Sequence, residues 1–261
     1  MKIHFLGTCS GTEPVKGSRH LAFVIEKDNK LYWFDAGEGS SYTAHVMGLD
    51  LLSVEAIFIS HSHMDHVGGL GNLLWNIRKI NNVEKKGRMK DRLLEVFMAD
   101  ELAFLSILAL LGQTEGNFKI DWQIKRRDIK KGLIFQDKDF LVYAKGNSHM
   151  GIPSDEKYLS HSFRIKGDGK SIVFSGDLGD LSDIQEFIDE PCDLLLMETG
   201  HFTPSEVAEY ISKKGDFVKS LCFIHNGRLI LENPKRELKK VRKIIWQKVF
   251  IAKEASSLEI P

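Results

Sequence analysis

The hexapeptide His61-Ser62-His63-Met64-Asp65-His66 decides the fold of this sequence of 261 residues. It follows an apolar run, Ala56–Ser60, which predicts a buried β-strand. Gly68-Gly69 comes next, and the apolar residues after it recur three and four positions apart, which predicts a helix over Leu70–Ile80. Three imidazoles and a carboxylate are therefore placed on one short loop between a strand and a helix.

This loop carries the side chains of a metal site. Residues two apart on an extended segment project to the same side, so His61 and His63 can bind one ion. Asp65 and His66 follow where the backbone turns into the helix, and they can bind a second ion. Imidazole with carboxylate is the ligand set typical of zinc, and it would also hold iron or manganese.

One loop cannot supply all the ligands of two ions, so further ligands must come from elsewhere in the chain. Three candidates each sit just past a predicted strand: His149, Asp177 and His225. Because strand ends in a layered sheet converge on one edge, these side chains can share a site with the hexapeptide.

The rest of the sequence alternates predicted strands and helices without a repeat or a linker, and we interpret residues 1–261 as a single domain. This pattern predicts an αββα sandwich, in which two mixed β-sheets pack face to face with helices on the outer faces. The expected elements include a strand at Phe118–Ile124 and helices at Asp180–Phe187 and Pro234–Lys248. The helix Glu101–Leu111 is apolar nearly all round, which predicts that it is buried against a sheet.

Composition and charge limit the classes of function. Lys plus Arg equals Asp plus Glu at 36 each, so no overall field favours nucleic acid or membranes. The cysteines, Cys9, Cys192 and Cys222, are widely spaced and form no CxxC pair, which argues against a disulfide framework or a cysteine zinc site. The N-terminus lacks the apolar core of a signal peptide, and the longest apolar stretch is too short for a bilayer span. We expect a cytoplasmic protein without a membrane partner.

With five motifs in order over nearly its whole length, the sequence resembles the metallo-β-lactamase-fold hydrolases. The resemblance implies two divalent metal ions, zinc in the first place, with manganese or iron as alternatives. It implies that one ion is held by His61, His63 and His149 and the other by Asp65, His66 and His225, with Asp177 bridging them. Two such ions lower the pKa of a bridging water enough to form the attacking hydroxide near neutral pH, and Asp65 is a candidate for orienting it.

Several local features resemble the ribonuclease Z branch of this superfamily. They are Phe5–Thr12, Phe34–Ser40, and Pro153-Ser154 shortly after His149. Because dimers are common in this branch, the resemblance also carries the expectation of a homodimer.

Two further candidates concern catalysis and substrate binding. Glu198-Thr199 with His201 resembles the branch's catalytic Glu and His pair, which implies a proton donor to the leaving group. The branch separates the two elements further, so the alternative is a plain histidine at the entry to the next helix. Arg228, three residues past His225, is either a phosphate clamp, because guanidinium matches a fork of oxygens, or a surface arginine.

The segment between His149 and Asp177 separates two classes of substrate. The tRNA-processing enzymes of the branch carry a long flexible arm there, whereas only 27 residues intervene here, and a loop and a hairpin account for them. The sequence therefore favours a phosphodiesterase acting on a small phosphodiester or nucleotide, cyclic ones included, over one acting on precursor tRNA. The basic stretches 78–92 and Lys235–Lys248 could contact RNA phosphates, but such runs are more often solvated faces.

Three alternatives stay open. The first is a hydrolase of a thioester, lactone or β-lactam, because the fold alone does not choose a substrate. The second is a ribonuclease Z-like RNA endonuclease. The third is a non-hydrolytic metal or redox protein on the same scaffold, which no flavin or rubredoxin-like segment supports.

Overall fold

Two β-sheets, each with seven strands among the described residues, lie at the centre of the computed structural model, which describes residues 1–84, 87–114, 116–138, 140–155, 157–213 and 215–260. The first sheet has the order β14 (Ser256–Glu259), β1 (Lys2–Gly7), β2 (Ala22–Lys27), β3 (Lys30–Phe34), β4 (Val54–Phe58), β5 (Leu93–Phe97) and β6 (Gln123–Arg127). The second has the order β13 (Lys248–Ile251), β12 (Ser220–Ile224), β11 (Leu194–Glu198), β10 (Lys170–Phe174), β9 (His161–Gly167), β8 (Phe140–Gly146) and β7 (Gly132–Asp137).

Both sheets are mixed. The strands from β3 to β6 and those from β10 to β13 run parallel, whereas β14 to β3 and β7 to β10 pair antiparallel. Parallel neighbours place the carboxyl ends of several strands at one edge, and loops from that edge are where ligands bind in such sheets.

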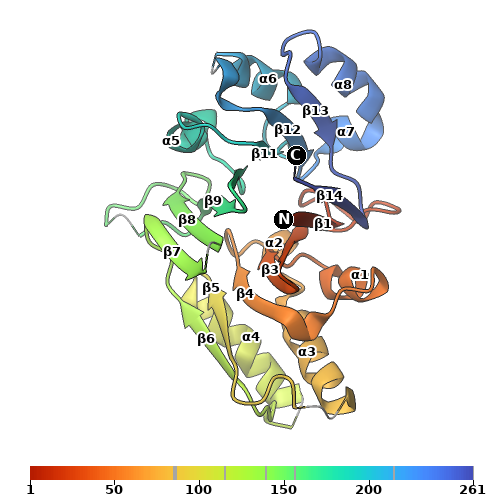
Figure 1. Ribbon diagram of the computed structural model, residues 1–261, viewed down its shortest axis with the longest axis vertical. Helices are drawn as coiled ribbons and strands as arrows, with labels where there is room; N and C mark the ends of the chain where they lie inside the picture. The colour runs from red at the N-terminus through yellow and green to blue at the C-terminus, as the bar shows by residue number, and fades with distance from the viewer. Residues whose placement is uncertain (85–86, 115, 139, 156, 214, 261) are drawn as a thin grey trace.

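Helices cover the outer face of each sheet (Figure 1). The first sheet is covered by α1 (Ser40–Val46), α3 (Leu70–Glu84) and α4 (Glu101–Thr114), with the short α2 (Met64–Val67) just before α3. The second is covered by α5 (Gln185–Ile188), α6 (Pro204–Ser212), α7 (Arg228–Glu232) and α8 (Pro234–Val241). Single 3-10 turns lie at η1 (Leu51–Ser53), η2 (Leu181–Ile184) and η3 (Gly215–Phe217).

The apolar core is divided into three layers, as this architecture requires. One cluster of buried side chains lies between the first sheet and its helices, and another lies between the second sheet and its helices. The cluster between the two sheets is rich in phenylalanine: Phe23, Phe34 and Phe58 of the first sheet contact Phe163 and Phe174 of the second. The αββα sandwich is confirmed.

Three predicted elements are wrong in extent. The strand expected at Phe118–Ile124 begins at Gln123, because Asn117 and Phe118 have φ of 64° and 46° and form a turn. The helix expected at Pro234–Lys248 ends at Val241, and the β-branched and aromatic residues of β13 pair with β12 instead. The helix expected at Asp180–Phe187 is a 3-10 turn followed by one turn of α-helix.

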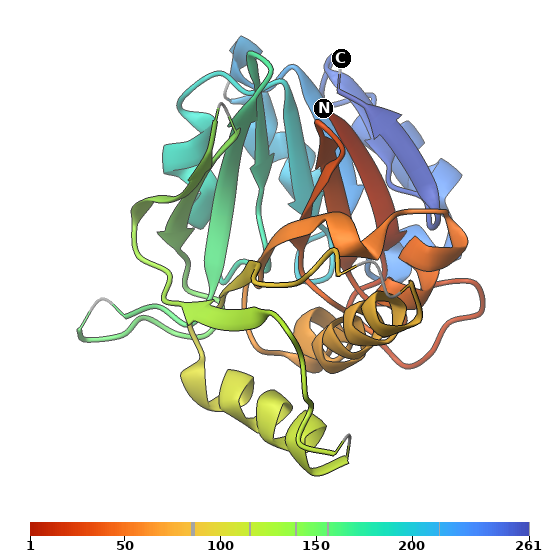
Figure 2. The same cartoon turned by 60° about the horizontal axis from the view of Figure 1, so that its bottom comes forward.

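The prediction that the helix beginning at Glu101 is buried is also wrong. Of α4, only Phe104 and Leu111 are buried, and the side chains of Leu102, Leu105 and Leu110 are 76%, 52% and 64% exposed. The helix packs one side against α3 and projects beyond the sheets, as Figure 2 shows at the lower edge of the molecule. No described helix is both long and apolar enough to cross a membrane.

Candidate metal centre

The candidate ligands lie at one edge of the sandwich, on loops that follow strands of both sheets. The hexapeptide follows β4, while His149, Asp177 and His225 follow β8, β10 and β12 of the second sheet. The predicted convergence is found: the structure brings all seven side chains together in two adjoining groups.

The first group consists of His61, His63 and His149. Nε2 of His61 lies 3.0 Å from Nδ1 of His63, and Nε2 of His149 lies 3.2 Å from the same atom. Three ring nitrogens that point at one place are the arrangement in which imidazoles bind a metal ion. His61 is buried and His63 is exposed, so the group opens toward solvent on one side.

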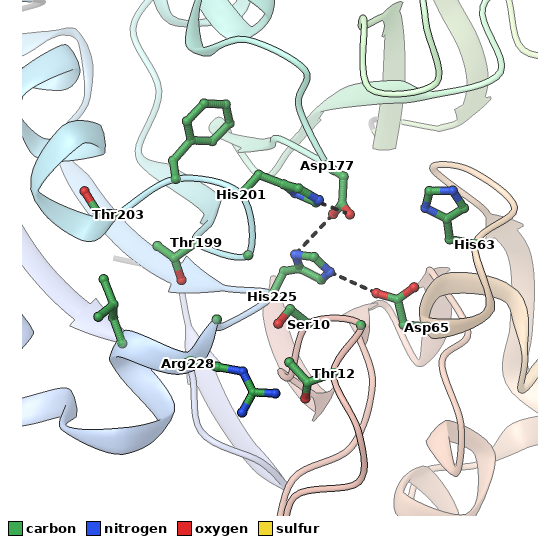
Figure 3. Close-up of a pocket in the computed structure, with 15 residues that line it drawn as sticks. Ser10, Thr12, His63, Asp65, Asp177, Thr199, His201, Thr203, His225 and Arg228 are labelled. Atoms are coloured by element: carbon green, nitrogen blue, oxygen red, sulfur yellow. Dashed lines mark hydrogen bonds and ion pairs between the residues drawn. The ribbon is translucent and has the colours of Figure 1, made fainter.

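The second group consists of Asp65, His66, Asp177 and His225. Oδ2 of Asp65 lies 3.3 Å from Nε2 of His66 and 3.0 Å from Nε2 of His225, and the two ring nitrogens are 3.3 Å apart. In Figure 3 each ring nitrogen of His225 faces a carboxylate: Nδ1 lies 3.2 Å from Oδ1 of Asp177, and Nε2 faces Asp65. The loop that bears His225 has a φ of 52° at that residue, a left-handed backbone that turns its imidazole into the site.

Asp177 lies between the two groups. Its Oδ1 is 3.3 Å from Nε2 of His66, and its Oδ2 is 3.8 Å from Nε2 of both His61 and His149. Oδ1 is buried and accepts no hydrogen bond. A buried carboxylate oxygen without a hydrogen-bond donor is costly, so the donor set fits a pair of divalent cations.

Asp35 fixes one of these imidazoles from behind. Its Oδ2 lies 2.8 Å from Nδ1 of His66, and the backbone N–H of Ser60 donates to its Oδ1 at 2.6 Å. A carboxylate on Nδ1 places the proton there and leaves Nε2 free to bind a metal ion.

The electrostatics of the site prepare His61 and the carboxylates as ligands. Burial and the neighbouring His66 hold the pKa of His61 well below its usual value, so its ring is neutral. Burial alone would raise the pKa of Asp65 and Asp177, but interactions with His225 and His66 outweigh it and lower both pKa values. Neutral imidazole and ionised carboxylate are the forms that bind metal ions. The surrounding carboxylates raise the pKa of His66 and His225 despite their burial, so these two rings must lose a proton to bind an ion.

Glu198 and His201 form a pair beside these groups. Nδ1 of His201 is 2.9 Å from Oε2 of Glu198, and the backbone N–H of Leu178 donates to Oε1 at 2.7 Å. Glu198 is fully buried, whereas the side chain of His201 is 42% exposed and points toward Asp177 (Figure 3). The hydrogen bond with Glu198 raises the pKa of His201, which favours an imidazolium that can donate a proton.

A cavity of about 480 Å³ opens over the two groups. Neutral polar side chains, among them Ser10, Thr12 and Thr203, form part of its wall, and Arg228 lies at its rim. Arg228 does not point at the candidate ligands: its Nη2 donates to Oε2 of Glu13 at 2.5 Å.

Sequence comparison gives the family of this chain. Residues 1–210 match the family model described as "Anti-Pycsar protein Apyc1". The chain belongs to this Apyc1 family.

Relatives of this Apyc1-family chain confirm the predicted superfamily and its ribonuclease Z branch. The ribonuclease Z of Picrophilus torridus is 27% identical over an alignment that covers 86% of this chain and 85% of that protein. Two solved structures share the fold: the metallo-β-lactamase fold protein YhfI from Bacillus subtilis, with a TM-score of 0.75 and 15% identity, and human tRNase Z, short form, with 0.73 and 19%. The first alignment covers 98% of both chains and the second covers all of both.

Two glycines of the Apyc1-family chain give the ligands room, and the sequence analysis did not single out either one. A Cβ on Gly200 would lie 2.7 Å from two atoms of the His225 ring, and one on Gly11 would lie 2.9 Å from Oδ2 of Asp65. Such contacts are shorter than packed atoms tolerate, so a side chain at either position must displace the candidate ligand. Glycine in loops next to histidine or aspartate ligands is a weak signal, and only the structure makes it specific.

Proposed function

We propose that this chain is a dinuclear-metal phosphodiesterase that hydrolyses a small phosphodiester or nucleotide, cyclic ones included. The observation that supports this function is the position of Asp177 between two groups of candidate ligands, with distances of 3.3 Å and 3.8 Å to their ring nitrogens. Two-ion sites with one bridging carboxylate are typical of enzymes that cleave phosphate esters. Zinc suits this mixture of imidazole and carboxylate best, and manganese or iron remain alternatives.

When bound, the two ions would activate the attacking water and neutralise charge on the phosphate oxygens. The chain's own side chains then have separate tasks. Asp65 orients the attacking water, and His201, held protonated by Glu198, gives its proton to the leaving oxygen. Arg228, the candidate phosphate clamp, lies at the rim, where its partner carboxylate holds it, and it would contact a phosphate oxygen there only if that ion pair were broken.

The segment between His149 and Asp177 supports a small substrate. Its described residues, 150–155 and 157–176, form the β9–β10 hairpin and one short exposed loop, which extends from the body of the molecule in Figure 2. A cavity of about 480 Å³ is within the range for small-molecule sites.

The test is turnover of bis-p-nitrophenyl phosphate by the purified holoenzyme. His63→Ala and chelation should each abolish hydrolysis, because the open imidazole group then loses a ligand or its ion. His45→Ala, on the exposed side of α1, is the matched control and should keep full activity. Turnover that survives both treatments would contradict a metal-dependent mechanism.

An RNA endonuclease is the second candidate, because the curated relative described above is named ribonuclease Z. It predicts cleavage of precursor tRNA at rates above those for cyclic nucleotides. A panel of cyclic nucleotides, precursor tRNA, a thioester and a β-lactam separates the two and also tests the carboxyl-type alternatives. Metal analysis of protein purified without chelators identifies the ions.

A further inference from the structure

Glu13 and Arg228 form an ion pair at the rim of the cavity. Glu13 lies on the loop between β1 and β2, and Arg228 is the first residue of α7, three residues after the candidate ligand His225. Nη2 of Arg228 donates to Oε2 of Glu13 at 2.5 Å, and both side chains are 61% exposed. The pair thus joins two segments that are 215 residues apart in the chain.

The backbone sets the position of Glu13 relative to Arg228. The loop that carries Glu13 is hydrogen-bonded to the segment that leads into α7: the backbone N–H of Ser10 donates to the carbonyl of Asn226 at 3.2 Å, and that of Asn226 donates to the carbonyl of Thr8 at 2.7 Å. The Ser10 hydroxyl adds a second contact to Asn226 at 3.1 Å. The two charges are therefore held near each other by the same contacts that position the site.

The ion pair removes the one fixed cation from the rim. Arg228 is the single lysine or arginine among the described residues that line the cavity, and the other lining side chains are histidines, the carboxylates Asp65 and Asp177, and neutral groups. Its hydrogen bond lowers the pKa of Glu13, so that carboxylate is ionised at neutral pH. A ligand that reaches the rim then meets a pair with no net charge.

We propose that Glu13 is a specificity-determining residue, which balances Arg228 and so limits the site to phosphodiesters without a further phosphate group. This inference rests on the proposed function. The single charge of a phosphodiester is accommodated at the candidate ligands. A second phosphate group at the rim gains no net attraction from Arg228, because the carboxylate of Glu13 repels that phosphate. Arg228 stays paired with Glu13 while a diester is bound, and Glu13 thereby sets how many phosphate groups are accepted.

The experiment compares the dinucleotide UpU with pUpU, which differs only by a 5′-phosphate. Glu13→Gln keeps the shape of the side chain and removes its charge, so we expect kcat/KM for pUpU to rise about fivefold, through KM, and that for UpU to change by less than about twofold. The gain should shrink as salt is added, because an exposed charge is screened. Removing Arg228 as well, in Glu13→Gln with Arg228→Gln, should cancel the gain.

Glu232→Gln is the matched control. Glu232 lies on the same helix as Arg228 and acts on it through its charge. Among the described residues no hydrogen bond joins the two side chains, so this substitution leaves the contact between Arg228 and Glu13 in place. Its selectivity between UpU and pUpU should stay that of the unmodified protein. Equal changes for both dinucleotides in Glu13→Gln would overturn the role of Glu13, and so would a fall in kcat for both.

A binding measurement separates this inference from the proposed function. Calorimetry on the holoenzyme compares thymidine 5′-phosphate with thymidine 3′,5′-bisphosphate, neither of which has a diester to cleave. Glu13→Gln should tighten binding of the bisphosphate about fivefold more than that of the monophosphate. If the binding difference appears but no diester is hydrolysed, the proposed function fails and the role of Glu13 in charge selection remains. If diesters are hydrolysed but the binding difference is absent, the proposed function stands and the role of Glu13 fails.

Discussion

The imidazole of His225 leaves no room beside it for a methyl group at position 200. Gly200→Ala would place a Cβ 2.7 Å from Cε1 and Nδ1 of that ring and push it from Asp65. Because a shift of about 1 Å in a reacting group can cost a hundredfold in rate, we expect kcat to fall between about tenfold and a hundredfold. Steady-state kinetics and metal analysis measure the loss.

The control for this change is Gly112→Ala on α4, where an added Cβ meets no atom within 4 Å. It should keep the activity and, if anything, raise stability, since alanine favours helix over glycine. A Gly200→Ala variant with unchanged kcat and metal content would show that His225 tolerates displacement.

At the scale of single residues, the sequence predicted the candidate ligands but not the residues around them that give them room or balance the charge at the rim. His61 to His66 could be recognised because ligand spacing is local, and His149, Asp177 and His225 because each follows a predictable strand. Glu13 carries no such signal, since its importance depends on a contact with a residue 215 positions away. Gly11 and Gly200 were missed for the same reason: the clearance they provide exists only in three dimensions.

Asp100, the residue just before helix α4, contacts the metal-binding hexapeptide. The Asp100 carboxylate accepts from the backbone N–H of Ala103 at 2.9 Å and from the hydroxyl of Ser62, within the hexapeptide, at 2.8 Å. This one side chain therefore caps the helix and ties it to the metal-binding loop. Capping side chains at helix N-termini contribute about 1 kcal/mol.

Asp100→Ala should therefore lower the melting temperature by about 2–4 °C, because a loss of about 1 kcal/mol in the free energy of unfolding corresponds to that shift in a chain of this size. It should also weaken metal binding, because Ser62 loses its partner. Asp100→Asn keeps one oxygen, which can accept from the backbone N–H of Ala103, while its NH2 can no longer accept from Ser62; it should therefore restore the capping part of the stability in a thermal melt. An Asp100→Ala melt identical to that of the unmodified protein would exclude a capping role.

At the scale of elements, the sequence predicted helix α4 but not its surroundings. The run from Leu102 to Leu111 is apolar in all directions, and such a composition usually means burial. Whether a helix is buried depends on which elements pack against it, and here α3 covers only one side of α4. Likewise, the helix was predicted to run on to Lys248 because Ile244 and Ile245 continue an apolar pattern past Val241, and β13 was not predicted.

We propose that the exposed leucines of α4 would form the interface of the expected homodimer. Leu105→Glu with Leu110→Glu should convert a dimer into a monomer in sedimentation experiments. In a two-fold symmetric dimer the same helix face of both subunits would meet, so the new carboxylates would repel each other across the interface. Val83→Glu on α3, also exposed, is the control and should leave the mass unchanged. A monomer before any substitution would contradict the homodimer.

The candidate ligands tie both sheets to one centre, so ions should stabilise the whole molecule. Ions that bind only the folded chain add about 2.7 kcal/mol when present at a hundred times Kd. Chelation should therefore lower the melting temperature by roughly 5–10 °C. The loss should be smaller for His63→Ala, which has fewer ligands to begin with, and an unchanged melt would mean that the folded chain holds no ions.

The order in which ligands occur along the chain also has a consequence for synthesis on the ribosome. The group of His61, His63 and His149 is complete in sequence more than seventy residues before His225 is translated. An emerging chain can therefore gather the donors of one group while the other still lacks its last imidazole. The second group is complete only once β12 has been made, with the parallel strand β13 still to follow, so a product that ends before His225 would lack one full ligand group.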